Sequence, residues 1–242
     1  MESRFGRVAV KFAEHRGWIF DALFPRACIR CGGEGAAFCV SCVEAWVPNV
    51  LRNRCPFCEQ GAVGATCKDC RGKVFLDGLV AVLSYGDPVV RQALTAWKYY
   101  GDEAYRDVVM GWMRRFVGQN IFTRDSGTDD MLISPVPLHS YRRRERGFDQ
   151  AEEIATVVSE LLGVSCGQSV ARVRMTQPRV RTARGERQVG DLDGIFEALE
   201  PVAPHILLCD DVFTSGATMD SAAKALKEAG AKTVLGFAVA RG

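Results

Sequence analysis

Two adjacent carboxylates, Asp210 and Asp211, stand shortly before a run of small and hydroxyl residues at positions 214–218. The apolar residues 206–209 have the length of a buried strand, and residues 221–227 repeat apolar side chains at helical spacing. The run therefore connects a strand's carboxyl end to a helix's amino end, where free N–H groups and the helix dipole favour an anion such as a phosphate monoester. Because the aspartates would repel that anion, they suit sugar hydroxyls or a divalent cation. The alternative is an ordinary strand–turn–helix with a capped helix.

Eight of the ten cysteines occur as Cys-x-x-Cys pairs. Two residues between thiolates is the spacing of a knuckle that presents both sulfurs to one ion, and two knuckles complete a tetrahedral zinc site. Pairing neighbouring knuckles predicts two structural sites, the first from Cys28, Cys31, Cys39 and Cys42 and the second from Cys55, Cys58, Cys67 and Cys70. A cross-braced pairing of the first knuckle with the third stays open, and disulfides are the less favoured alternative. The remaining two, Cys166 and Cys209, are interpreted as core residues.

Two arginine-rich stretches, residues 137–150 and 172–187, offer a second kind of chemistry. The first holds four arginines within five residues, and the second has almost no apolar content, which is typical of an exposed arm. Arginine forks suit bidentate contacts with phosphate, so both stretches are candidates for binding a diphosphate. Solvated charged faces and contacts with a nucleic-acid backbone are the alternatives.

The composition describes an ordinary globular chain. Its 242 residues are 48% hydrophobic and 25% charged with a net charge of +2, so the molecule as a whole is not a polycation. We find no signal peptide and no apolar run near the roughly 20 residues of a membrane span, and we predict a cytoplasmic protein, where paired cysteines more often mean metal than disulfide. Three regions are expected: an N-terminal helical segment at 1–27, a double zinc ribbon at 28–72 and a main domain at 78–242.

The main domain must position the candidate loop, and its pattern alternates strands with helices. This alternation predicts an α/β fold with a parallel sheet, in which ligands bind at the carboxyl ends of strands. Strands are expected at residues 78–85, 131–137, 169–173, 206–209 and 233–240, and helices at 89–97, 104–117, 150–162 and 221–227. The candidate loop and the first arginine stretch each follow a strand and precede a helix, so they should meet at one edge of the sheet.

Strand, acidic pair, loop and helix together resemble the phosphoribosyl-pyrophosphate (PRPP) motif of type I phosphoribosyltransferases. The matching residues are Asp210, Asp211, Thr214, Ser215, Gly216, Ala217 and Thr218. The resemblance implies that the acidic pair holds the ribose hydroxyls of PRPP or a related ribose phosphate, and that the loop cradles the 5′-phosphate. It also implies that Mg²⁺ and arginines hold the pyrophosphate, and the arginines we name for this role are Arg144, Arg146, Arg174 and Arg187.

Over nearly the whole chain the sequence resembles the ComF (GntX-like) family of competence proteins. The motifs that carry this resemblance are the cysteine-rich N-terminal module and then Trp97-Lys98-Tyr99, Pro135-Val136-Pro137-Leu138, Arg146-Gly147-Phe148-Asp149-Gln150-Ala151, Glu186-Arg187, Gly194-Ile195-Phe196 and Asp210-Asp211-Val212. The family usually has Asn at the position of Asp149. The resemblance implies a double zinc ribbon with two structural Zn²⁺ ions, joined to a type I phosphoribosyltransferase fold. It also implies a role in DNA uptake during natural transformation, with single-stranded DNA and DNA-uptake proteins as partners.

Two functions stay open at this point. One is a PRPP-binding, phosphoribosyltransferase-like protein, which either transfers a phosphoribosyl group or only senses PRPP. The other is a non-catalytic accessory protein that binds single-stranded DNA through the zinc ribbons and the arginine stretches. The sequence identifies neither an acceptor substrate nor a clear general base, since His139 is a lone histidine in a basic stretch.

Overall fold

The computed structural model describes residues 26–48, 51, 54–61, 64–120, 130–138, 141, 143–144, 147–174 and 194–242. The expected N-terminal helical segment lies outside these residues except for its last two positions, as does most of the second arginine stretch. Among the site residues named above, Arg146 and Arg187 lie outside the described residues.

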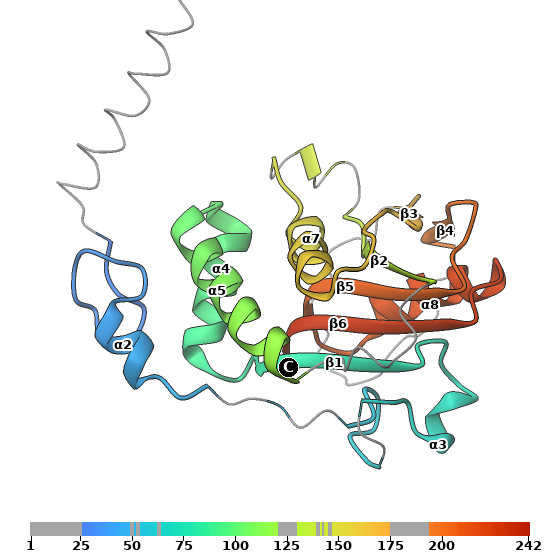
Figure 1. The fold of residues 1–242 in the computed structure, drawn as a ribbon, viewed down its shortest axis with the longest axis horizontal. Coiled ribbons are helices and arrows are strands. Elements are labelled where there is room, and N and C mark those ends of the chain that lie inside the picture. The colour runs from blue at the N-terminus through green and yellow to red at the C-terminus, as the bar shows by residue number, and fades with distance from the viewer. Residues whose placement is uncertain are drawn as a thin grey trace, which may run out of the picture.

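Four parallel strands form the central sheet in the order β1-β6-β5-β2 (Figure 1). The strands are β1 (Gly78–Ser84), β2 (Met131–Pro135), β5 (His205–Phe213) and β6 (Thr233–Arg241). Because all four run in the same direction, their carboxyl ends share one edge, and the segments that follow them meet there. The predicted α/β fold with a parallel sheet is confirmed.

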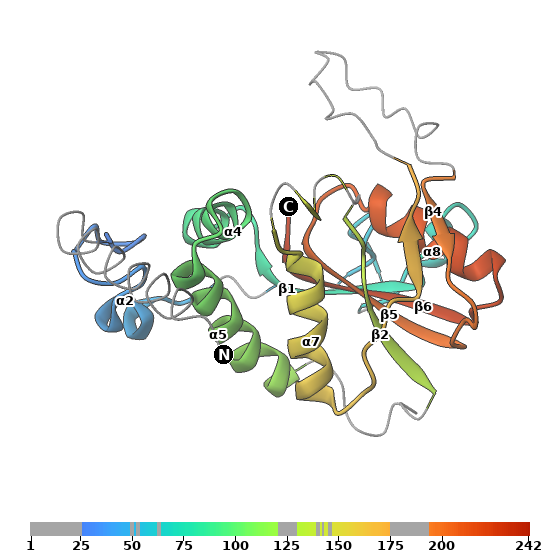
Figure 2. The same cartoon turned by 90° about the horizontal axis from the view of Figure 1, so that it is seen from above.

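Helices cover both faces of the sheet, because successive side chains of a strand point to opposite faces. One face carries α4 (Pro88–Tyr100), α5 (Glu103–Asn120) and α7 (Gln150–Leu162), and the other carries α8 (Ala217–Glu228) (Figure 2). In β5, Leu207 and Cys209 enter the core under α4, α5 and α7, whereas Ile206 and Leu208 enter the core under α8. Within the described part of the chain, no helix is both long and apolar enough to cross a membrane.

Local signals explain where α4 begins and ends. The side chain of Asp87 accepts a 2.8 Å hydrogen bond from the backbone N–H of Val89, and Pro88 takes the first helical position. At the other end, Gly101 adopts a left-handed conformation with φ of 61° and closes the helix. The helix is therefore longer than the expected 89–97, and it includes Lys98.

Two parts of the main domain differ from expectation. The expected strand at 169–173 is β3 (Val170–Arg172), and it pairs antiparallel with β4 (Phe196–Ala198) instead of joining the parallel sheet. The sequence pattern missed β4 because three residues are too few for a periodicity signal.

The interpretation of Cys166 as a core residue is wrong. This residue is exposed, because the connection from α7 to β3 runs along the outer edge of β2 and bridges to Ile133 there.

The two groups of four cysteines contact different parts of the main domain (Figure 1). They carry the short helices α2 (Val40–Ala45) and α3 (Lys68–Arg71). The first group shares the core of α4 and α5. There the ring centroid of Trp112 is 6.1 Å from that of Phe38 and 4.8 Å from that of Trp46. The second group leads into β1, through a bridge between Ala65 and Gly78. The two groups thus support opposite faces of the sheet.

Candidate functional site

The acidic pair occupies the end of β5, and the chain then turns directly into α8. β5 is longer than expected, because its pairing with β6 continues to Phe213, opposite Arg241, and so includes both aspartates. α8 begins at Ala217, with Gly216 as its N-cap residue. Ala217 and Thr218 therefore belong to the first turn of the helix, and the loop itself is shorter than the expected 214–218.

A small, open pocket lies at this turn. Its lining includes Asp210, Thr214, Ser215, Gly216, Ala217 and Thr218. These are six of the seven residues named for ribose and 5′-phosphate binding. The seventh, Asp211, contacts a different element.

Gly216 allows the chain to make the turn. Its φ of 76° lies in the left-handed region, and an ideal Cβ at this position would lie 2.4 Å from Cζ of Phe213. Backbone conformation and packing therefore both require glycine here. The turn also exposes the start of α8, whose first N–H groups have no partners within the helix and suit an anion.

Asp211 forms an ion pair with Lys98. Nζ of Lys98 donates to Oδ2 of Asp211 at 2.6 Å, and the Asp211 side chain is only 7% exposed. Because α4 carries Lys98, this contact joins the end of β5 to the helical layer on the face away from α8. The sequence pattern includes Lys98 only in the Trp97-Lys98-Tyr99 motif and assigns it no partner. The signal in the sequence that could have identified Lys98 is its place directly after a tryptophan. The structure buries that tryptophan, and Trp97 is 1% exposed.

Asp210 stands in a different electrostatic environment from its neighbour. Burial and, after it, the charge of Asp211 raise the pKa of Asp210 to about 8, although the charge of Lys98 opposes this shift. The backbone N–H of Asp211 also donates to Oδ1 of Asp210 at 2.8 Å. Since Lys98 already compensates Asp211, the carboxyl group of Asp210 is the one that a bound cation would stabilise in its ionised form.

The arginines named for the pyrophosphate are described only in part. Arg144 is exposed on the connection from β2 to α7, which starts at the carboxyl edge of the sheet. Arg174 is exposed directly after β3, and Gly194, at the other end of the second arginine stretch, lies close to its guanidinium group. The pyrophosphate role of Arg144, Arg146, Arg174 and Arg187 stays a prediction.

Asp149 caps the start of α7. In the family that the sequence resembles, this position is usually Asn. The carboxylate of Asp149 accepts hydrogen bonds from the backbone N–H groups of Ala151 at 3.0 Å and Leu138 at 3.3 Å, which fixes the start of α7. The residue is 4% exposed, and burial raises its pKa. Next to this cap, Arg143 pairs with Glu152 at 2.7 Å. The acid at this position therefore organises the connection that carries Arg144.

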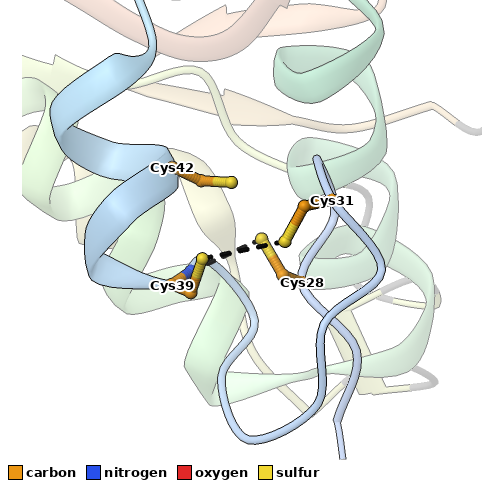
Figure 3. Close-up of side chains that lie close together, drawn as sticks. All are labelled: Cys28, Cys31, Cys39 and Cys42. Carbon is orange, nitrogen blue, oxygen red and sulfur yellow. Dashed lines mark hydrogen bonds between the residues drawn. The ribbon is translucent and has the colours of Figure 1, made fainter.

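The eight paired cysteines form two clusters of four, grouped by neighbouring knuckles as predicted. In each cluster the four Sγ atoms lie within 4.8 Å of one another. Figure 3 shows the first cluster, in which the side chains of Cys28 and Cys31 point toward those of Cys39 and Cys42. The Sγ atoms of Cys31 and Cys39 are 3.8 Å apart. Zinc–sulfur bonds of about 2.3 Å in a tetrahedron require nearly this separation.

The ionisation of the clustered cysteines explains why a dication suits each cluster. Burial disfavours the thiolate of Cys28, but backbone N–H groups, that of Cys39 foremost, lower its pKa to about 6. Burial, followed by neighbouring thiols, raises the pKa of Cys42 to about 12. The second cluster repeats this division, with the pKa of Cys55 lowered to about 6 and that of Cys70 raised to about 12. Four thiolates in such proximity need a positive ion, and both clusters fit structural zinc sites.

We expect the purified protein to contain two zinc ions per chain, one for each cluster. Cys31→Ser with Cys39→Ser should remove one ion, and Cys58→Ser with Cys67→Ser should remove the other, as measured by atomic emission spectroscopy. Cys166→Ser is the matched control, because this exposed thiol lies in neither cluster. Fewer than two ions in the unmodified chain, or a loss of zinc in the control, would contradict the assignment.

The two aspartates should affect stability in opposite ways. The raised pKa means that folded Asp210 keeps its proton at pH values where the unfolded chain, with an ordinary pKa of about 3.9, has released it. The free energy of unfolding should therefore fall as the pH rises from about 4 to about 8, and Asp210→Asn should remove this part of the slope. Asp211→Asn should instead cost about 1–3 kcal/mol, because it leaves Lys98 without this carboxylate.

Urea denaturation between pH 5 and pH 8 measures both effects. Asp107→Asn is the control, because the Asp107 side chain is 73% exposed. A full pH slope in Asp210→Asn, or an Asp211→Asn variant as stable as the control, would refute the electrostatic description.

The chain was compared with known proteins. No family model matches it. It is 27% identical over 214 residues to the competence protein ComFC of Bacillus subtilis (strain 168), an alignment that covers 84% of this chain and 83% of that protein. Identity with ComFC of Streptococcus pneumoniae (strain ATCC BAA-255 / R6) is 24%, over 86% of this chain and 89% of that protein. The DNA utilization protein YhgH of Salmonella typhi is 34% identical over 107 residues, which are 43% of this chain and 46% of that protein. The resemblance to the ComF competence proteins is thus confirmed over most of the chain, and the two four-cysteine clusters fit the double zinc ribbon that it implies.

Proposed function

We propose that this protein binds PRPP, or a related ribose phosphate, at the turn between β5 and α8, and that it takes part in DNA uptake. One observation carries the binding proposal. The pocket beside Gly216 combines the amino end of a helix of 12 residues with hydroxyl side chains and a carboxyl group. A ribose 5-phosphate presents the complementary groups, namely a phosphate monoester and vicinal hydroxyls.

The phosphate would occupy the start of α8. There the free N–H groups of the first helical turn and the hydroxyls of Thr214, Ser215 and Thr218 can donate hydrogen bonds to phosphate oxygens. All three hydroxyl residues are exposed and so accessible to a ligand. No acidic side chain lies between Phe213 and Met219, which leaves this part of the pocket without competing negative charge.

The acidic pair would serve the ribose and its metal ion. Mg²⁺ prefers oxygen ligands, and it is usually held by one or two carboxylates together with substrate phosphates and water. Asp210, which lines the pocket, fits this chemistry directly, and Asp211, which is paired with Lys98, is the second carboxylate of the proposed acidic pair. A cation near Asp210 would favour its ionised form, so binding should release a proton near neutral pH.

The arginines would complete the site on the pyrophosphate side. Arg144, Arg146, Arg174 and Arg187 come from the two stretches that adjoin α7 and β3. Their guanidinium groups suit the bidentate binding of a diphosphate, and the same contacts would stabilise it as a leaving group. These residues would recognise a ribose phosphate and define no acceptor for a transfer, so we propose binding alone.

Isothermal titration with PRPP and Mg²⁺ tests the binding site. We expect saturable binding by the unmodified chain and a loss of at least tenfold in affinity after Asp210→Asn with Asp211→Asn. Gly216→Ala should weaken binding as well, because its Cβ would collide with Phe213 and displace the loop. Asp107→Asn serves as the control on an exposed carboxylate. The proposal fails if the unmodified chain does not bind, or if the double variant binds with undiminished affinity.

The names of the relatives support the cellular role. Two of them are called competence protein ComFC, and a third is called a DNA utilization protein. We therefore assign the chain to DNA uptake. Its second candidate activity is non-catalytic binding of single-stranded DNA through the zinc clusters and the arginine stretches.

Deleting the gene in its own host should lower the frequency of natural transformation at least tenfold, and the unmodified chain should restore it. If ribose phosphate binding carries the role, Asp210→Asn with Asp211→Asn should fail to restore it. If DNA binding carries the role, Asp210→Asn with Asp211→Asn should restore transformation, whereas Arg144→Gln with Arg174→Gln should fail and should also reduce the salt dependence of binding to an oligodeoxynucleotide. Arg114→Gln, an exposed change on α5, is the control. An unchanged transformation frequency in the deletion strain would remove the proposed role.

A further inference from the structure

The second cysteine cluster lies directly against the candidate loop. Phe57 stands between the ligands Cys55 and Cys58, and its ring contacts that of Phe213 edge to face, with centroids 6.3 Å apart. Phe213 is 2% exposed and is the last residue of β5 before the loop. One end of the loop therefore starts from an aromatic contact with the knuckle.

The same two rings form the surface on which the loop turns. An ideal Cβ on Gly216 would lie 3.1 Å from Cε1 of Phe57, in addition to its 2.4 Å approach to Phe213. The backbone of the loop thus packs on both rings at once. If Phe57 moved away, the loop would lose one side of its support, and Phe213 would gain room to change rotamer.

Hydrogen bonds from the end of β6 and to the first turn of α8 hold the same cluster against the main domain. Nη2 of Arg241, at the end of β6, donates to the backbone oxygens of Pro56 at 3.0 Å and Cys55 at 3.5 Å. The segment that follows the last cysteine is held by α8. There the carboxylate of Asp220, in the first turn of that helix, accepts from the backbone N–H groups of Phe75 at 2.7 Å and Leu76 at 2.9 Å.

The first cluster offers a natural comparison. It packs through Phe38 and Trp46 on α5, in the core on the opposite face of the sheet from α8. In contrast, Phe57 packs against the core that contains Phe213, which precedes the loop, and Met219 in the first turn of α8. Figure 1 shows the corresponding separation of α2 from α3.

We propose that the metal of the second cluster holds the loop in its binding conformation, with Phe57 as the positioning residue that transmits this effect. Metal supplies much of the folding free energy of such small cysteine modules, and Phe57 lies between two ligands, so its position depends on the metal. The proposal rests on the proposed function, because it makes ribose phosphate binding depend on the second cluster and not on the first.

Amide hydrogen exchange of Asp220 and Gly242, in the absence of any ligand, is the primary test, because their N–H groups donate to the backbone oxygens of Gly216 at 2.8 Å and Phe213 at 3.0 Å and so report on the turn. Cys58→Ser with Cys67→Ser should increase exchange at these residues at least tenfold, whereas Cys31→Ser with Cys39→Ser should leave it unchanged while removing one zinc ion. Equal exchange in the two variants, whether both fast or both slow, overturns the proposal.

Phe57→Ala removes the ring but leaves all four cysteines of the second cluster in place. It therefore tests the role of the ring even if the cysteine variants fail to fold. It should retain both zinc ions and still increase exchange at Asp220 and Gly242, and Phe57→Leu should recover part of the protection. Phe75→Ala is the matched control, because this ring is 38% exposed and lies near Lys224 instead of the loop. Unchanged loop exchange in Phe57→Ala overturns the role of Phe57.

Titration with PRPP and Mg²⁺, and separately with inorganic phosphate, connects this coupling to ligand binding. Phe57→Ala should bind PRPP at least tenfold more weakly than Phe75→Ala. If the unmodified chain binds neither probe, the proposed function fails, whereas the exchange measurement still decides whether the second cluster supports the loop. If the unmodified chain binds and Phe57→Ala binds equally well, the proposed function stands and the coupling is overturned.

Discussion

The parallel pairing of β5 on both sides is the constraint on which the rest of the structure depends. β5 pairs with β2 over residues 205–209 and with β6 as far as Phe213, and its residues 206–209 are at most 1% exposed. A strand so enclosed can carry polar side chains only near its end. Asp210 and Asp211 therefore lie at the carboxyl edge of the sheet, and the next residues must turn immediately into α8 to cover the apolar face. The backbone N–H groups at the start of this helix become available there for the same reason.

The two aspartates show how neighbours in sequence can acquire different chemistry. Asp211 meets Lys98 from the helical layer on one face of the sheet, and this pair compensates its charge. Asp210 lines the loop pocket, and burial beside Asp211 raises its pKa to about 8. One carboxylate is thus paired with the helical layer, and the other carboxyl group lines the pocket and accepts a hydrogen bond from the backbone N–H of Asp211. In the site that we propose, a cation or a set of sugar hydroxyls would contact this carboxyl group.

The cysteine clusters occupy different positions relative to this edge, although their ligand spacing is the same. The first extends the core beneath α4 and α5 through its aromatic residues. The second places Phe57 against Phe213 and receives Arg241 from the end of β6. Metal binding in the first cluster would therefore stabilise the core beneath α4 and α5, whereas we propose that metal binding in the second stabilises the turn between β5 and α8. The alignments with the relatives named for competence cover 84% and 86% of this chain, and the alignment with the DNA utilization protein covers 43%.

The sequence by itself determined the features that depend on local spacing. Two residues between cysteines predicted the knuckles, although only the structure decided that neighbouring knuckles pair, and helical periodicity predicted the observed bounds of α7, Gln150–Leu162. The glycine and hydroxyl residues after Asp211 indicated the loop and its place before a helix.

Only the tertiary structure decided the contacts between distant segments. The pair of Lys98 with Asp211 spans 113 residues, and that of Phe57 with Phe213 joins the cysteine module to β5. The pairing of β3 with β4, and the exposure of Cys166 along the edge of β2, also depend on how layers pack. The physical reason is that the spacing of metal ligands, helix caps and the periodicity of side chains act over a few residues and are visible in the sequence. In contrast, burial and ion pairing depend on which surfaces meet after the chain has folded.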